Sequence, residues 1–158
     1  MSGPVRYPRS RKGRHSTCRA LRFLVDTNVF AETVKPKPER RVVTWLRDNE
    51  ANLYISTITI GEMRRGVERL QGGSRKALLT NWLELLGERM RGRILSFNTS
   101  TAHVWGQLKA RWEKEGISVP SLDSQIAATA QRHQLTVVTR NTTDFKRTGV
   151  KMLNPFGD

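Results

Sequence analysis

Short apolar runs alternate along this chain with longer stretches in which apolar residues recur every three or four positions. Runs of four or five apolar or β-branched residues predict buried strands, whereas the wider spacing predicts amphipathic helices. We expect strands at residues 21–25, 53–56, 94–97, 135–139 and 150–153. We expect helices over residues 27–34, from residue 38 onward, over 59–70, 74–90, 99–115 and 122–133, and just after residue 141.

This order of elements predicts the fold class. Strands that alternate with helices form a mainly parallel central sheet that is covered by helices on both faces. The sequence shows no internal repeat and no interdomain linker, so we expect one α/β domain. Because ligands of such folds bind at the carboxyl ends of the strands, functional side chains are expected directly after strands.

The start of the chain differs from the rest in charge. Residues 1–22 contain seven basic side chains and no acid, which is half of the formal net charge of +14. The segment is rich in Arg, Ser, Pro and Gly and has little apolar content with which to order itself. We therefore expect residues 1–20 to be a flexible basic tail and residues 21–158 to be the folded domain. A functional tail and an upstream start-codon artefact both fit.

Composition narrows the classes of function. The strong positive charge favours a polyanionic partner, either a nucleic acid or an acidic protein. Cys18 is the single cysteine, which excludes a disulfide framework and a cysteine zinc site. No apolar run approaches the ~20 residues of a membrane span, so we expect a cytoplasmic protein with no membrane partner.

Four acidic residues lie at junctions between strands and helices. Asp26 directly follows the first strand, and Glu62 and Asp144 lie in the first helical turn after the second and fourth strands. Asp123 begins the helix that leads into the fourth strand. Because the carboxyl ends of parallel strands share one edge, we expect the four carboxylates to meet there.

Each acid taken alone has a simpler explanation, which is helix capping. Asp26 can cap the helix that follows it, and residues 59–62 and 141–144 resemble capping boxes. Ser121 can cap the helix whose first turn holds Asp123. A cluster of all four has a different consequence, because converging carboxylates must either raise their pKa values or hold a cation. Hard oxygen ligands of this kind suit Mg²⁺ or Mn²⁺.

The segments that carry these acids resemble, in order, the four motifs of PIN-domain proteins. They are residues 23–28 (FLVDTN), 58–66 (ITIGEMRRG), 123–130 (DSQIAATA) and 137–145 (VVTRNTTDF). The ending at residues 153–156 (LNPF) resembles the VapC and FitB branch of that family, and the resemblance covers about residues 21–157. It implies a three-layer α/β/α sandwich and a metal-dependent endoribonuclease that acts as the toxin of a toxin–antitoxin pair.

The resemblance also implies roles for the acids. Asp26 and Asp123 would be the metal ligands, and Glu62 and Asp144 would complete the catalytic pocket. Asn141 stands where many relatives have an acid, and Asp144, three residues later, takes that fourth role. A bound Mg²⁺ or Mn²⁺ would neutralise the scissile phosphate and lower the pKa of a water, which then attacks the phosphorus.

Four polar residues beside the acids are candidates for supporting roles. Thr27 and Asn28 can orient a carboxylate or a metal-bound water, although capping and turn formation explain them equally well. Arg140 can bind a phosphate, although a solvated arginine is an equal alternative. Asn141 completes this set of substrate-binding or supporting residues.

The expected partners are an RNA substrate, a cognate antitoxin and a second copy of the chain. The homodimer would be built mainly from helices in residues 38–90, which carry the apolar residues Leu78, Leu79, Trp82, Leu85 and Leu86. Two other classes of function stay open: a PIN fold that binds nucleic acid without cutting it, and an unrelated phosphate-binding α/β domain. The latter lacks a Gly-rich loop after a strand, because residues 72–73 lie between predicted helices.

Overall fold

Five parallel strands form the centre of the computed structural model, which describes residues 20–157. They are β1 (Phe23–Val25), β2 (Leu53–Ser56), β3 (Ile94–Leu95), β4 (Thr136–Val138) and β5 (Met152–Leu153). Their order across the sheet is β3-β2-β1-β4-β5, with β1 in the middle. In the register of the central pair, Val25 lies opposite Val138, so β1 and β4 end side by side.

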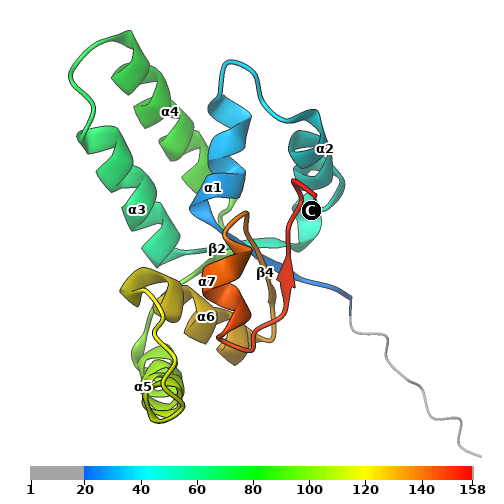
Figure 1. The fold of residues 1–158 in the computed structure, drawn as a ribbon. Coiled ribbons are helices and arrows are strands. Elements are labelled where there is room, and N and C mark those ends of the chain that lie inside the picture. Colours follow the sequence, from blue (N-terminus) through cyan, green and yellow to red (C-terminus); the bar gives the residue numbers. More distant parts are fainter. Residues whose placement is uncertain (1–19, 158) are drawn as a thin grey trace, which may run out of the picture.

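Helices connect the strands and cover both faces of the sheet (Figure 1). They are α1 (Thr27–Phe30), α2 (Arg40–Asp48), α3 (Thr57–Glu68), α4 (Ser74–Arg89), α5 (Thr99–Lys114), α6 (Ser121–His133) and α7 (Thr142–Lys146). Two short 3₁₀ helices, η1 (Ala31–Val34) and η2 (Glu50–Asn52), continue the loops after α1 and α2. None of the helices in residues 20–157 is long and apolar enough to cross a membrane.

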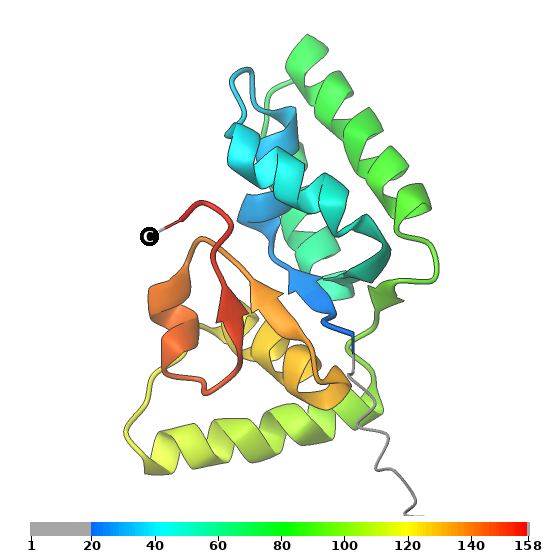
Figure 2. The same cartoon turned by 90° about the vertical axis from the view of Figure 1, so that its right-hand side faces the viewer.

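Alternation of side chains along the strands divides the interior into two cores. Phe23 and Val25 point to one face, where they pack with buried residues of α1, α2, α3 and α4. Leu24 points to the other face and packs with buried residues of α5, α6 and α7, including Trp112. Because the strands are buried on both faces, they are almost wholly apolar. The predicted three-layer α/β/α class is confirmed, and the layers are seen edge-on in Figure 2.

Several predicted element boundaries are wrong for local reasons. The strand expected at 94–97 ends at Leu95, because Asn98 caps α5 by accepting a hydrogen bond from the backbone N–H of Thr101 at 3.1 Å. The helix expected at 27–34 changes from α to 3₁₀ after Phe30. The next helix begins at Arg40 rather than residue 38, after a turn in which the buried Glu32 accepts from the backbone N–H of Glu39 at 2.8 Å.

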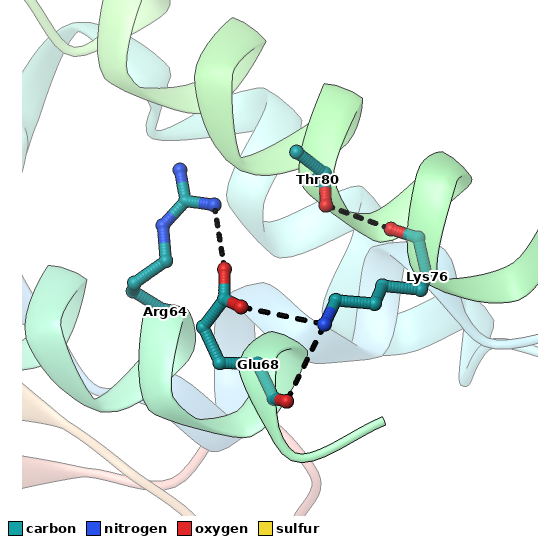
Figure 3. A network of polar contacts seen from close by, with 4 residues as sticks. All are labelled: Arg64, Glu68, Lys76 and Thr80. Atoms are coloured by element: carbon teal, nitrogen blue, oxygen red, sulfur yellow. Dashed lines mark hydrogen bonds and ion pairs between the residues drawn. The ribbon is translucent and has the colours of Figure 1, made fainter. Parts of the chain in front are cut away.

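The outer end of the α3–α4 hairpin is held by a small polar network (Figure 3). Glu68 of α3 accepts from Arg64 one turn earlier at 3.5 Å and pairs with Lys76 of α4 at 3.3 Å. Exposed pairs of this kind contribute little stability each, so the network mainly fixes how the two helices lie together. It thereby fixes α3, which carries Glu62.

The predicted basic tail lies outside the described residues except for Ala20, which is exposed. The division into a tail over 1–20 and a domain over 21–158 therefore stays a prediction. All four acids singled out in the sequence fall within the described part of the chain.

Candidate active site

Asp26 is the most deeply placed of the four acids. It follows β1 directly, is 6% exposed, and its backbone N–H donates to the carbonyl of Val138 at 2.9 Å. One carboxylate oxygen accepts from the backbone N–H of Thr27 at 2.8 Å, and the other accepts from the Thr139 hydroxyl at 2.9 Å. The side-chain amide of Asn28 lies 3.4 Å from that second oxygen. Burial raises the pKa of Asp26, and the bonds from Thr139 and Thr27 oppose that rise.

Glu62 approaches Asp26 from α3. Its carboxylate accepts from the hydroxyl of Thr27 at 3.3 Å, so Thr27 contacts two acids, one through its backbone and one through its side chain. Partial burial is the largest cause that raises the pKa of Glu62, and the charge of Asp26 adds to it. Arg65, one turn along α3, lowers that pKa.

Asp123 lies in the first turn of α6, whose start is fixed against α5. The indole N–H of Trp105 donates to the hydroxyl of Ser124 at 2.9 Å, and that hydroxyl donates to the carbonyl of Ser121 at 2.5 Å. Partial burial and the charges of the other three acids raise the pKa of Asp123 to about 6. Asp123 therefore lies close enough to the other three acids for their charges to act on its carboxyl group.

Asp144 completes this edge from α7. Its carboxylate accepts from the side-chain amide of Asn141 at 2.5 Å, and the backbone N–H of Asn141 donates to the Thr139 hydroxyl at 3.0 Å. Asn141 therefore links Asp144 to the same threonine that contacts Asp26. The structure brings together the four acids with Thr27, Asn28 and Asn141, whereas the guanidinium of Arg140 lies to one side, over Phe156.

Capping explains only Asp26 among the acids. Helix α3 begins at Thr57 with Ser56 as its cap, so Thr59 lies inside the helix and Glu62 in its second turn. The predicted capping box over 59–62 is therefore wrong. Ser121 is the first residue of α6 and caps nothing through its side chain. The side chain of Asn141 bonds to Asp144 rather than to a backbone N–H, so the second box is also wrong.

Thr139 is a contact of the site to which sequence reasoning assigned no role. It is fully buried, donates its hydroxyl hydrogen to Asp26, and accepts from Asn141 and weakly from Asn28. Its signal in the sequence is a hydroxyl residue directly after an apolar strand. That signal has meaning only once β4 is known to pair with β1, and the order of strands is not readable from the chain.

The donor set suits a hard divalent cation. Carboxylate oxygens that repel one another are the ligands Mg²⁺ and Mn²⁺ prefer, and Asp26 and Asp123 come from separate elements that face one site. Within residues 20–157, however, no three Asp, Glu, His or Cys side chains lie close enough together to coordinate one metal ion.

Burial and like-charge repulsion at Asp123 predict a stability change that can be measured without any substrate. The pKa of about 6 in the folded state exceeds the ordinary value of 3.8, so the folded state binds the proton more tightly. The free energy of unfolding therefore falls as pH rises from about 4 to about 6 and stays lower above that window. Asp123→Asn should remove this penalty and raise the melting temperature at pH 8, by roughly 2–4 °C per kcal/mol of relieved repulsion.

Calorimetry in EDTA at pH 8 and at pH 4 checks this. The exposed Asp48, which pairs with Arg47 at 3.2 Å, supplies the control variant Asp48→Asn, with little change expected at either pH. An unchanged or lower melting temperature of Asp123→Asn at pH 8, or an equal rise at both pH values, would contradict the electrostatic explanation.

The chain is similar to known proteins over most of its length. Residues 23–151 match the PIN domain family. The chain is 39% identical over 138 residues to Toxin FitB of Neisseria gonorrhoeae, which covers 86% of this chain and 99% of that protein. It is 34% identical to VapC ribonuclease Y4jK of Sinorhizobium fredii, over 85% of this chain and 97% of that one.

A solved structure shares the fold as well. The crystal structure of FitAcB from Neisseria gonorrhoeae superposes with a TM-score of 0.79 at 38% identity, covering 85% of this chain and 98% of that chain. The family match over residues 23–151 includes strands β1 to β4 and all four acids. This chain belongs to the PIN-domain family.

Proposed function

We propose that this protein is a toxin endoribonuclease that hydrolyses RNA phosphodiesters at the edge of the sheet where Asp26, Glu62, Asp123 and Asp144 meet. The observation that carries the proposal is the set of contacts by which Thr27 links Asp26 to Glu62, and Thr139 with Asn141 links Asp26 to Asp144. Asp123 lies close enough for the charges of these acids to add to the effect of burial on its pKa. Similarity to Toxin FitB and to a VapC ribonuclease supports the same activity. RNA is the substrate class.

Mg²⁺ or Mn²⁺ is the cofactor that this donor set fits, with Asp26 and Asp123 as its ligands. When bound, the ion would supply Lewis-acid stabilisation of the charge on the scissile phosphate. Thr139 and the backbone N–H of Thr27 hold the two oxygens of Asp26 in fixed directions. The side chain of Asn141 donates to one oxygen of Asp144, and the Thr27 hydroxyl donates to one oxygen of Glu62. Such supporting bonds fix how ligands present their lone pairs.

A PIN fold that binds nucleic acid without cutting it is the second candidate. The four intact acids oppose it, because carboxylates repel phosphates unless a cation lies between them. A purely binding surface would gain nothing from the electrostatic cost of this pocket. The basic charge of the remaining surface fits either candidate, and therefore does not distinguish them.

The proposed protein partners are a cognate antitoxin and a second copy of the chain. Helix α4 presents Leu78 and Leu85 at 53% and 55% exposure, one above the other on the same side of the helix. Leu85 also lines an apolar cleft of about 380 Å³ between α2 and α4. Large apolar side chains exposed together favour a protein contact.

The first functional prediction concerns metal and the acids. We expect RNA cleavage that needs Mg²⁺ or Mn²⁺, stops with EDTA, and yields 3′-hydroxyl and 5′-phosphate ends. Asp26→Asn should lose more than ~100-fold in activity, since altering a mere supporting group of a ligand costs 10–100-fold. Thr139→Val should fall within that smaller range. At limiting metal, activity should rise with pH through about 6, as the proton leaves Asp123 and frees its oxygens for the ion.

The matched control is Asp48→Asn, which should cut like the parent. Circular dichroism should show that Asp26→Asn keeps its fold, because asparagine caps helices as well as aspartate. Full cleavage by a folded Asp26→Asn protein, or cleavage that survives EDTA, would refute the mechanism.

A second prediction concerns assembly. We expect light scattering to give a dimer at micromolar concentration, and the double variant Leu78→Glu, Leu85→Glu to give a monomer that still melts cooperatively. The buried charges would oppose association, while both sites tolerate charge in the free chain because they are exposed. A parent protein that is monomeric at this concentration would count against the dimer.

A third prediction concerns residues 1–20. A shortened protein beginning at Ala20 should cut RNA at saturating substrate as fast as the full chain, because all four acids lie beyond the tail. Its affinity at low salt should fall, since fewer basic groups remain to contact phosphates. The measurement is binding and turnover over a salt series. Loss of cutting by a shortened protein that folds normally would show that the tail takes part in the site.

A further inference from the structure

Residues 154–157 form a hydrogen-bonded turn beside the acidic pocket. The chain leaves β5 at Leu153, whose carbonyl accepts from the backbone N–H of Thr139 at 3.0 Å, so the turn begins at the same edge of the sheet. The side chain of Asn154 accepts from the N–H of Phe156 at 3.0 Å and donates to the carbonyl of Gly157 at 2.9 Å. These bonds close residues 154–157 on themselves.

Helix α2 holds this turn from outside. The guanidinium of Arg41 donates to the carbonyl of Phe156 at 3.2 Å, and the end of the chain lies next to α2 in Figure 1. Gly157 has a φ of +88°, a backbone conformation that glycine adopts far more readily than other residues. The sequence Asn-Pro-Phe-Gly therefore fits this position closely, and the ring of Phe156 packs against the core on the α2 side of the sheet.

The side chain of Arg140 lies over the ring of Phe156. The Arg140 guanidinium lies 4.7 Å from the ring centroid, a cation–π contact. The backbone N–H of Arg140 donates to the side chain of Asn28 at 3.1 Å, and Asn28 also contacts Asp26 and Thr139. Arg140 is thus tied to the acidic pocket through its backbone, while its charged end is held away from the acids.

The charge of Arg140 is left available. Within residues 20–157, no carboxylate lies within ion-pair distance of Arg140 or of Arg41. Lys35 is the largest cause that lowers the pKa of Glu32 and pairs with its carboxylate at 2.6 Å, and the charge of Arg140 makes only a smaller contribution. An exposed guanidinium without a protein anion, held over an aromatic ring, can still bind a phosphate through two hydrogen bonds.

We infer that Arg140, presented by Phe156 and the turn over residues 154–157, binds a phosphate of the RNA backbone next to the one that is cut. This rests on the proposed function and names a positioning residue for its substrate. The acids receive the scissile phosphate, and Arg140 holds the neighbouring one, so that the strand crosses the pocket in one direction. Phe156 acts through Arg140 by fixing the place of its guanidinium.

The test compares matched variants in steady-state cleavage of a short single-stranded RNA. Arg140→Gln should raise KM roughly three- to fivefold with kcat nearly unchanged, the size expected of one exposed ion pair. Phe156→Leu, which keeps an apolar side chain but loses the ring, should shift KM in the same direction, and Phe156→Tyr should behave like the parent. Arg91→Gln is the control. Arg91 is exposed and precedes β3, the outermost strand on the side of the sheet away from β4 and β5.

Binding supplies a readout that a merely structural role would not move. In the Asp26→Asn background, the slope of log Kd against log salt concentration should fall by about 0.7 on adding Arg140→Gln, the value of one phosphate contact on a single strand. Arg91→Gln should leave that slope alone. A parent enzyme that cuts RNA while Arg140→Gln keeps its KM and its salt slope would overturn this inference and leave the proposed function standing.

Two other outcomes have equally definite meanings. A fall in kcat with KM unchanged would place Arg140 at the reacting phosphate and overturn its role at the neighbouring one. A parent protein that binds RNA but never cuts it would remove the proposed function, while a loss of salt slope in Arg140→Gln would still support the phosphate contact.

Discussion

The parallel pairing of β1 with β4 is the contact on which the rest of the site depends. With Val25 opposite Val138, the next residue of each strand, Asp26 and Thr139, lie beside each other. Asp26 then accepts hydrogen bonds from the Thr139 hydroxyl and from the first backbone N–H of α1. Asn28 and Asn141 each donate a hydrogen bond to the same Thr139 hydroxyl. Because side chains alternate along a strand, a slip of one residue would exchange the two cores as well as break this contact.

Assembly of the site costs stability. Four carboxylates gathered at one edge repel each other, and burial together with the charges of the other three acids raises the pKa of Asp123. The large buried surface of the two cores, which meet at the sheet, outweighs this cost. Functional sites commonly retain such local conflicts, because the arrangement that would stabilise the fold best would not bind the ligand.

The charge distribution has a related logic. A protein with a formal charge of +14 attracts polyanions, yet its pocket is lined by acids. A phosphate can therefore be drawn to the molecule in general and enters the pocket only where a cation compensates the acids. Arg140 lies beside the pocket, attached to Asn28 by its backbone, while its guanidinium lies over the ring of Phe156.

Much of the fold was readable from the chain because its signals are local. Apolar runs and the three-to-four spacing identified each strand and long helix, since they depend only on neighbours in sequence. The junction positions of Asp26, Glu62, Asp123 and Asp144 were readable for the same reason. The ends of the elements were harder to predict, because side-chain caps such as Ser56 and Asn98 set where a helix begins, and the apolar spacing does not show this.

Only the tertiary structure decided which of these local features meet. The order β3-β2-β1-β4-β5 set Thr139 against Asp26, and the turn over residues 154–157 brought Phe156 beneath Arg140. Both contacts join segments that are far apart along the chain or on different strands. By itself the sequence determined which residues carry charge and where each element lies. The pairing of strands and the packing of helices decided the rest, because they depend on contacts between distant residues.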